Sequence, residues 1–546
     1  MCGLPFGALG ATMPDPSERA VVIGASMGGL LAAHALANTF GEVVLLERDQ
    51  LPSGIAHRKG VPQSRHAHIL LSRGREILEE LFPGLTQDLV EQGAPLARSD
   101  QVRRFIGRGY YCRFGSQLRN LLVSRPLLEV QVRSRVLAHS QVRAIGGADV
   151  VGLVASRDRR RVDGVRLAYR RPDGGRSAEE TLEAALVVDA TGRGSRSSAW
   201  LGAMGYAPPE EERIEVGVSY ASRHYRREPH HLGGDLSALV APTPACRRAA
   251  VVAAQEGGRW VVTVVGFHGD HLRTDSDGFV GFAQGLAVPD VHELVSRAEP
   301  LDDPVPANFP ANLRRRYERL SRFPDGLLVF GDAICCFNPM YGQGMTVVAL
   351  QALAPCECLA SGTGGLAPRF FQRAARAVDT PWTLAAGNDQ RLLRPGAPRS
   401  SVAARLLEWY VGRLHLAARR DPVAALAFVR VTGLIDPPEA MLRPRVAAHV
   451  PGATCAGIRW SRSEPGSTLG PSKWVLIVVR RRMAISRSAC QVGSHMLPAL
   501  PRHSTAAVFA RPTWARTAGL FGWPARDGDR EARRTRVSIT AALFLT

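Results

Sequence analysis

The sequence predicts a mixed α/β fold that combines a parallel-sheet dinucleotide-binding domain, an inserted antiparallel β domain and C-terminal helices. Three observations lead to this prediction. Residues 20–47 read as strand, glycine-rich turn, helix and strand, and residues 327–350 repeat the strand, turn and helix. Residues 213–310, between them, carry the alternating and apolar patterns of an antiparallel sheet. With 546 residues, the chain is long enough for two or three domains.

The first segment has the features of a turn that binds a pyrophosphate. A buried strand at Ala20–Ile23 precedes the turn GASMGG, and an apolar helix is expected over Leu30–Phe40. Gly24 permits the sharp turn, and Gly29 lets the helix pack closely on the strand. The helix N-terminus offers free N–H groups and the positive end of its dipole. The alternative is a glycine-rich turn that binds nothing.

Two positions near this turn determine how well it matches the dinucleotide pattern. Glu47 ends the second strand about 20 residues on, where an acidic side chain accepts hydrogen bonds from a ribose. The middle glycine of G-x-G-x-x-G is missing, because Ser26 stands there, although Gly28 adds a small residue beside it.

The next loop is rich in basic residues. Arg48, Arg58 and Arg65 fall on or near it, where each can pair with a phosphate or remain solvated. Residues 69–82 then have the apolar spacing of a helix. The sequence SRPLLE starts another helix, with Ser124 as its N-cap.

A second strand and small-residue turn follow in the first domain. Residues 146–155 and 161–168 alternate as strands of a meander. Ala185–Val188 then enters the sheet, Asp189 lies at its carboxyl end, and Thr191–Ser195 forms a turn. Ligands of open α/β sheets bind outside the carboxyl ends of the strands. A second turn at such an end therefore strengthens the prediction of a ligand site at the first.

The return segment supplies the other end of the predicted site. Leu327–Phe330 reads as a buried strand, and Asp332 just beyond it can accept hydrogen bonds from polyol hydroxyls. The N–H groups of the turn from Gly342 to Met345 open a helix and can meet negative charge. The alternative is a buried strand and a helix with incidental glycines.

The last part of the chain divides into helices and a tail. Helices are expected over Val402–Arg419 and Ala424–Leu434, and beyond Pro451 we expect an irregular, disordered tail. The predicted divisions are an N-terminal extension (1–18), the first part of the dinucleotide-binding domain (19–205), a substrate domain (206–310), the second part of the dinucleotide-binding domain (311–360), a helical region (361–451) and a basic tail (452–546).

The charge and hydropathy of the sequence indicate which macromolecular partners and which cellular location to expect. The net charge of +20 suggests nucleic acid or an anionic membrane, but 67 of the 69 basic residues are arginine, a bias typical of GC-rich genomes. Residues 452–546 alone carry a net +11, so we expect no specific nucleic-acid partner, while a peripheral membrane contact stays open. No apolar run is long enough to span a membrane, and the N-terminus lacks a secretory signal pattern, so we expect a cytoplasmic protein.

The cysteines and histidines do not indicate a metal site. The nine cysteines form no C-x-x-C pair and are interpreted as reduced thiols. His66 and His68 can in principle bind a metal, but no partner cluster accompanies them. The better interpretation is a loop that contacts cofactor or substrate.

Four motifs together resemble a known family. GASMGG with Glu47 and Arg48, the SRPLLE helix, VVDATGRGSR and LLVFGDAICCFNPMYGQGMTV are similar to FAD-dependent monooxygenases of the p-hydroxybenzoate-hydroxylase-like fold. Within that superfamily, the sequence looks closest to the squalene-epoxidase-like branch, which includes bacterial polyketide polyene epoxidases. The resemblance covers about residues 19–450 and implies a glutathione-reductase-type, Rossmann-like FAD domain.

The resemblance also implies roles for the matching positions. The pyrophosphate of FAD would lie at the first turn, the adenosine ribose at the end of the second strand, the adenine against backbone near residue 150, and the ribitol and isoalloxazine at the return segment. The expected cofactor-binding residues are Gly24, Ser26, Met27, Gly28, Gly29, Glu47, Arg48, Arg125, Val150, Asp332, Pro339, Gly342, Gly344 and Met345.

The chemistry that the resemblance implies is transfer of one oxygen atom from O2, through a flavin C4a-hydroperoxide, to a large apolar substrate of secondary metabolism. Epoxidation needs no nucleophile or base, so no catalytic residue is named, whereas aromatic hydroxylation would benefit from a base. The alternative within the fold is a flavin-dependent C=C reductase or dehydrogenase. Halogenation is disfavoured because a Trp-x-Trp-x-x-Pro signature is absent.

The electrons would come from NAD(P)H, either directly or through a separate flavin or protein reductase. Asp189-Ala190-Thr191-Gly192 replaces the adjacent Asp-Gly of hydroxylases that use NAD(P)H. Direct binding of NAD(P)H is therefore in doubt.

Overall fold

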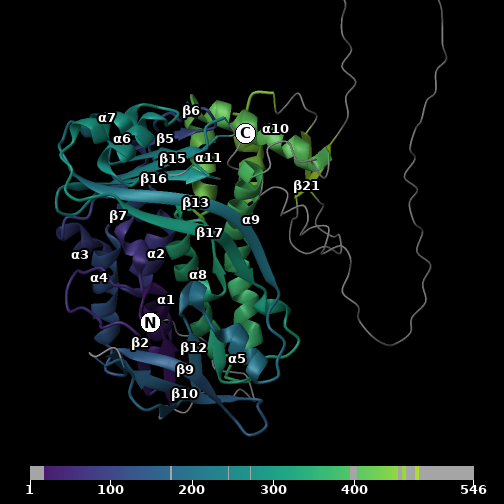
Figure 1. Ribbon diagram of the computed structural model, residues 1–546. Helices are drawn as coiled ribbons and strands as arrows, with labels where there is room; N and C mark the ends of the chain where they lie inside the picture. The colour runs from purple at the N-terminus through teal and green to yellow at the C-terminus, as the bar shows by residue number, and fades with distance from the viewer. Residues whose placement is uncertain are drawn as a thin grey trace, which may run out of the picture. The chain divides into compact units, whose positions relative to one another are not determined.

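Figure 1 shows the computed structural model of the chain. The structure describes residues 18–171, 175–243, 245–267, 269–270, 272–393 and 402–452, and the backbone of two paired antiparallel strands, β20 (Ile458–Arg462) and β21 (Trp474–Val478). Residues up to Pro451 belong to one compact unit, and residues 452–535 belong to a second. The predicted N-terminal extension and the rest of the predicted tail lie outside the described residues.

A five-stranded parallel sheet forms the centre of the dinucleotide-binding part. Apolar β-branched and leucine side chains bury both of its faces, as parallel sheets require. The strand order is β18-β12-β1-β2-β8, so the return segment joins the sheet of the first segment, as predicted. The strands are β1 (Arg19–Ile23), β2 (Glu42–Glu47), β8 (Val142–Gly146), β12 (Leu186–Asp189) and β18 (Leu327–Val329).

The register of this sheet brings the predicted site residues to one edge. Glu47 at the end of β2 is paired with Gly146 at the end of β8. Ile23 at the end of β1 is paired with Asp189, which in turn is paired with Val329. Since all pairs are parallel, the turns that follow these strands meet at the carboxyl edge of the sheet.

Helix α1 (Met27–Ala37) packs against this sheet and is buried on almost every side. It contacts α4 (Arg125–Leu137) and α8 (Gly344–Leu359), which explains why its sequence MGGLLAAHALA has no polar face. The helix begins three residues earlier than the predicted Leu30, because Ser26 adopts the extended conformation of an N-cap.

The helix expected over residues 69–82 is shorter in the structure. Ile69 and Leu70 form strand β3, which pairs with β7 (Arg119–Leu122), and α2 (Ser72–Leu81) starts only after them. The apolar pattern of a short buried strand directly before a helix extends the helical pattern, so the sequence does not separate them. The third strand of this small sheet is β4 (Leu96–Arg98).

An eight-stranded sheet carries the predicted substrate domain, in the order β19-β17-β13-β16-β15-β14-β5-β6. Figure 1 shows this sheet beside the parallel one, with α6 (Ser276–Gln284) and α7 (Asp290–Arg297) on its outer side. The strands from the insertion are β13 (Glu211–Arg226), β14 (Ser237–Val240), β15 (Arg248–Gln255), β16 (Arg259–Phe267) and β17 (Val305–Arg315).

Three strands of this sheet come from outside the predicted limits 206–310. They are β5 (Val102–Ile106), β6 (Gly109–Tyr110) and β19 (Cys335–Cys336). Strand β5 pairs in parallel with β14, a partner far along the chain that no local pattern in the sequence specifies. The predicted limits of the substrate domain therefore miss part of its sheet.

The remaining elements surround these two sheets. A meander contains β9 (Ala148–Ala155) and β10 (Val162–Tyr169), which match the two predicted strands, and β11 (Glu180–Glu183), which was not predicted. The other helices are α3 (Leu85–Glu91), α5 (Ser197–Ala203), α9 (Leu366–Leu393), α10 (Val402–Ala418), α11 (Pro422–Thr432) and α12 (Pro444–Ala447). Within the described ranges, none of the helices has the length and apolar character needed to cross a membrane.

Candidate functional site

The turn after β1 leaves no room for side chains at two glycines. Gly24 has a φ of +98°, and a Cβ there would lie 2.9 Å from the carbonyl oxygen of Ala190. A Cβ on Gly29 would lie 1.6 Å from the carbonyl oxygen of Gly24. The turn therefore approaches the helix closely, and the first amides of α1 are left for an external acceptor, as at any helix N-terminus.

Ser26, which stands at the missing glycine, links the turn to α4. Its Oγ donates to Glu129 Oε2 at 3.0 Å and accepts from Arg125 Nη2 at 2.8 Å. The departure from the glycine pattern therefore has a structural role, since Ser26 fixes the predicted cofactor residue Arg125.

A buried network of charges lies behind the turn. Arg58 Nη1 lies 2.9 Å from Glu47 Oε2, and Arg58 Nε donates to Glu129 Oε1 at 3.0 Å. Burial by itself would raise the pKa of Glu129, but the charges of Arg125 and Arg58 hold that pKa below its ordinary value. Glu129 is therefore ionised at neutral pH, and it positions both arginines.

Glu47 also joins the end of β2 to the turn. Its carboxylate accepts from Ala25 N at 2.9 Å and from Asp49 N at 3.1 Å. Each carboxylate oxygen can accept more than one hydrogen bond, so Glu47 keeps capacity for a hydroxyl group of a ligand.

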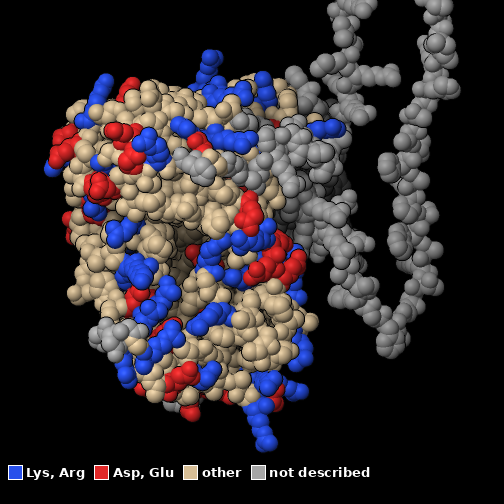
Figure 2. Space-filling model, viewed as in Figure 1, with Lys and Arg blue, Asp and Glu red and all other residues tan. Residues whose placement is uncertain are grey.

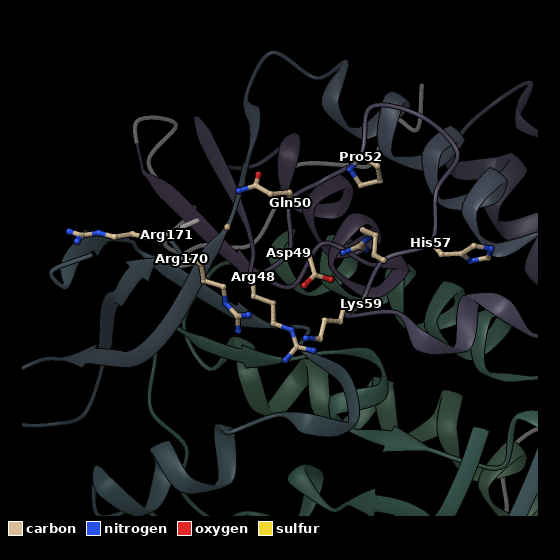
Figure 3. Close-up of a pocket in the computed structure, with 10 residues that line it drawn as sticks. Arg48, Asp49, Gln50, Pro52, His57, Lys59, Arg170 and Arg171 are labelled. Carbon is tan, nitrogen blue, oxygen red and sulfur yellow. The ribbon is translucent and has the colours of Figure 1, made fainter. Parts of the chain in front are cut away.

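A cavity of about 520 Å³ adjoins the end of β2. Figure 3 shows the side chains of Arg48, Asp49 and Lys59 gathered at its centre, with Arg170 reaching toward Arg48 from the opposite wall and Arg171 pointing away. The cavity is thus predominantly basic. Figure 2 shows one face of the molecule, with a hollow near its middle and both basic and acidic side chains around it.

Val150 does not line this cavity. It lies inside β9, with its side chain buried, and its carbonyl oxygen accepts a hydrogen bond from Arg196. Gly147, which follows the end of β8, lines the cavity instead. The boundary between β8 and β9 is not visible in the run GGADVVGLVA, and the adenine contact near Val150 stays a prediction.

The turn after β12 is held by Asp189, which is completely buried. Its carboxylate accepts hydrogen bonds from the Thr191 amide, the Ser195 hydroxyl and the Ser197 hydroxyl. Its hydrogen-bonding capacity is used within the turn, so Asp189 is a structural residue.

Asp332 lies just past the end of β18, in the short 3-10 turn Gly331–Ala333. Its side chain is accessible to solvent, yet the surrounding protein is dense enough to raise its pKa, and the charge of Arg125 opposes part of that rise. Asp332 is therefore near enough to Arg125 for the two charges to interact.

A buried polar cluster fixes the loop that precedes α8. Asp389 on α9 accepts hydrogen bonds from Asn312 Nδ2 at 2.7 Å, Asn338 Nδ2 at 3.1 Å and Tyr341 Oη at 2.7 Å. Burial raises the pKa of Asp389 to about 6. The sequence patterns did not reveal this anchor, because Asp389 stands alone among helical residues far from the loop.

The loop fixed in this way presents open backbone at its end. A Cβ on Gly342 or Gly344 would meet no atom within 4 Å, and Gly342 has a φ of +66°. Pro339, Gly342, Gly344 and Met345 all have some solvent exposure, whereas Gln343 is buried and donates to the carbonyl oxygen of Thr432 at 2.8 Å. A planar group can approach this backbone without meeting side chains.

A second cavity, about 170 Å³ in volume, begins at this loop and is largely apolar. Residues 339–342 form one wall. Alternate residues of β5 and β14 form another, and residues of α9 and α11 close it. The predicted helical region therefore contributes directly to this cavity, which the sequence did not indicate.

The predicted histidine loop is packed against the eight-stranded sheet. His66 Nδ1 lies 2.8 Å from Ser222 Oγ, and burial lowers its pKa to about 4. Burial also lowers the pKa of His68 to about 3, with a further contribution from Arg125. Both imidazoles are therefore neutral at neutral pH. No cluster of three metal-binding side chains occurs among the described residues.

Of the three loop arginines, only Arg58 is buried, and it pairs with glutamates. Arg48 lies at the basic cavity, and Arg65 is exposed. The described cysteines 112, 246, 335, 336, 356 and 358 form no disulfide.

Comparison with known proteins places this arrangement in a family. The family model described as FAD dependent oxidoreductase matches residues 20–214, which contain the first turn, Glu47 and Arg125. Protein Rv3254 of Mycobacterium tuberculosis (strain ATCC 25618 / H37Rv) is 35% identical over 435 residues, which cover 77% of this chain and 90% of that protein. This chain belongs to the FAD-dependent oxidoreductases.

Solved structures show that this flavoenzyme has the fold of the FAD-dependent monooxygenase superfamily. The flavin-dependent brominase Bmp2 matches with a TM-score of 0.57 and 14% identity, over 76% of this chain and 93% of that one. The p-nitrophenol 4-monooxygenase PnpA from Pseudomonas putida DLL-E4 matches with a TM-score of 0.55 and 16% identity, over 77% of this chain and 98% of that one. The predicted fold class, superfamily and FAD-dependent enzyme are confirmed, and the individual site residues stay predictions.

Proposed function

We propose that this flavoenzyme is a monooxygenase that transfers one oxygen atom from O2 to a largely apolar organic substrate, by epoxidation or hydroxylation. The observation that carries the proposal is the shared loop. Residues 339–342, expected to line the isoalloxazine, also form a wall of the apolar cavity. A substrate in that cavity would lie beside the reactive end of the cofactor.

The residues present fit FAD. In the proposal, the first turn and the N-terminus of α1 bind the pyrophosphate, since Gly24 and Gly29 admit no side chain. Glu47 and Arg48 bind the adenosine ribose, with the adenine in the basic cavity against Gly147 rather than Val150. Arg125 and Asp332 lie close enough to interact and would bind the phosphate and ribitol part.

When bound, FAD supplies the redox chemistry that activates O2. The chain's own contribution is positioning and exclusion of water. The N-terminus of α8 at Gly344 and Met345 would stabilise negative charge on the ring through its free amides and dipole. The apolar walls of the cavity keep water from the reacting atoms.

We also propose an electron donor, a metabolic role and a cellular location. NAD(P)H would supply electrons, directly or through a reductase, and the departure at Asp189–Gly192 favours the separate reductase. The resemblance to epoxidases supports a role in secondary metabolism. The sequence pattern supports a cytoplasmic location, with peripheral membrane contact left open.

Product mass tests the proposed reaction. FAD-loaded full-length protein is reduced, mixed with a panel of polyenes and aromatic compounds, and exposed to O2, and the products are weighed by mass spectrometry. We expect O2 uptake that depends on substrate and a product heavier by one oxygen atom. A product heavier by two hydrogens, formed without O2 uptake, would instead identify a C=C reductase.

A further inference from the structure

One charged side chain stands in the otherwise uncharged lining of the second cavity. Arg104 lies at the middle of β5, and it lines the cavity together with Val102 and Ile106, since alternate residues of a strand face the same side. None of the other described residues that line this cavity is acidic or basic. The cavity is therefore apolar with a single fixed positive charge.

Arg104 has few partners in the part of the chain that the structure describes. Its Nη1 donates to the carbonyl oxygens of Ser99 at 2.9 Å and Val102 at 3.0 Å, while Nε and Nη2 make no hydrogen bond there. The side chain is 8% exposed, and burial lowers its pKa to about 10, so it stays charged at neutral pH. Its guanidinium carbon lies 5.6 Å from the centroid of the Phe114 ring, and the charge of Asp235 acts on it from a greater distance. No carboxylate among the described residues pairs with it directly, and a buried charge without a close counter-charge is costly.

The acids nearest to β5 are engaged elsewhere. Asp235 accepts from Arg103 Nε at 3.0 Å and from Arg113 Nη1 at 2.6 Å, and Asp290 pairs with Arg103. The neighbouring arginines are thus paired, whereas Arg104 on the opposite face of the strand has no carboxylate within 4 Å among the described residues.

A second polar group in the cavity also lacks partners. Asn388 on α9 is 1% exposed, and neither its amide oxygen nor its amide nitrogen has a hydrogen-bond partner among the described residues. A buried amide without partners is unfavourable, so this side chain too is suited to a polar group of a ligand. It stands beside the loop anchor Asp389.

We propose that the substrate of this cavity is an organic acid, with an apolar body and a carboxylate that pairs with Arg104. The guanidinium donors left open, Nε and Nη2, form the side-on fork that binds both oxygens of a carboxylate. A further polar atom of the substrate would bond to Asn388. This inference rests on the proposed function, because it takes the second cavity as the substrate site.

Matched ligands test the inference with FAD-loaded full-length protein. Benzoate, 2-naphthoate and dodecanoate are each compared with their methyl ester by calorimetry. We expect at least one acid to bind about 10- to 100-fold more tightly than its ester, the range for a hydrogen bond to a charged group. Arg104→Met should remove this preference and leave ester binding unchanged, and Arg104→Lys should restore part of it.

Arg113→Met is the matched control, because it removes an arginine that is 60% exposed near the same strand and leaves Asp235 paired with Arg103. It should leave the preference for acids intact. Equal binding of every acid and its ester, or a preference that persists in Arg104→Met, would overturn the inference. If Arg104→Met fails to fold, the comparison of acids with their esters in the wild-type protein still tests the inference.

The same samples separate this inference from the proposed function. FAD content and O2 uptake are measured alongside binding. Preferential binding of an acid with bound FAD but no oxygenated product supports the carboxylate site and contradicts the monooxygenase. If esters are oxygenated as readily as acids, the result supports the monooxygenase and contradicts the carboxylate site.

Discussion

At the scale of residues, single side chains connect the two ends of the predicted cofactor site to the core. Ser26 links the first turn to Arg125 and Glu129, and Asp389 fixes the loop before α8. Neither role follows from the sequence motifs alone, because each depends on a contact between distant segments. Motif residues such as Gly24 and Glu47 could be found from the sequence. The sharp turn requires a glycine at position 24, and binding of a ribose hydroxyl favours an acidic side chain at position 47.

Asp389 predicts a pH dependence of stability. Its pKa rises from 3.8 to about 6 on folding because it is buried, so the folded state binds more protons than the unfolded state between about pH 4 and pH 6. The free energy of unfolding should therefore fall as pH rises through this window, by about 3 kcal/mol at most, and level off above it. Urea unfolding of wild-type protein and Asp389→Asn from pH 4 to 7.5 measures this.

The variant should lack the part of the pH dependence that Asp389 causes. Since other carboxylates titrate in both proteins, the difference between the two curves is the quantity to compare. Identical slopes between pH 4 and pH 6 would show that Asp389 does not hold its proton more tightly in the folded protein.

Glu47 predicts an effect on cofactor affinity. Gln in its place still accepts the bond from the Ala25 amide but lacks the charge, so its hydrogen bond to a ribose hydroxyl is weaker. We expect Glu47→Gln to raise the Kd for FAD about 10-fold or more, as measured by fluorescence titration of the apoprotein. Glu42→Gln, on the same strand, is the control and should bind FAD normally. An unchanged Kd for FAD in Glu47→Gln would show that the charge of Glu47 does not contribute to FAD binding.

At the scale of elements, the close approach of α1 to the first turn is set by glycine. A Cβ on Gly29 would lie 1.6 Å from the Gly24 carbonyl oxygen, so Gly29→Ala must displace the helix or the turn. We expect a loss of about 3 kcal/mol in the free energy of unfolding, together with weaker FAD retention. Gly202→Ala in α5, where a Cβ meets nothing within 4 Å, should leave FAD retention unchanged and should not lower the free energy of unfolding, since alanine favours a helix more than glycine does.

The sequence predicted local elements well and their limits less well. Four of the five strands of the parallel sheet follow from apolar runs that end in small residues, and these were found close to their observed bounds, whereas β8 was not predicted. The pairing of β5 with β14 and the replacement of a helical turn by β3 could not be found, because strand partners depend on tertiary contacts.

At the scale of the whole molecule, the chain separates into a unit up to Pro451 and a second unit over residues 452–535. Most of the basic excess lies in the second part of the sequence, whereas all predicted cofactor residues lie in the first. We therefore expect residues before 452 to be sufficient for cofactor binding.

A truncation tests this division. Protein ending at Pro451 should purify with FAD at the same ratio as the full chain and melt at nearly the same temperature, because its core clusters are complete. It should also lose any salt-sensitive binding to DNA or anionic vesicles that the full chain shows. A truncated protein that cannot retain FAD would show that the C-terminal part supports the site.

The most direct test of the central claim is the visible spectrum of purified full-length protein, with identification of any cofactor released on denaturation. We expect a yellow protein with the spectrum of oxidised flavin, release of one FAD per chain, and bleaching on reduction that reverses in air. A colourless protein that takes up no FAD when the cofactor is added would contradict the account.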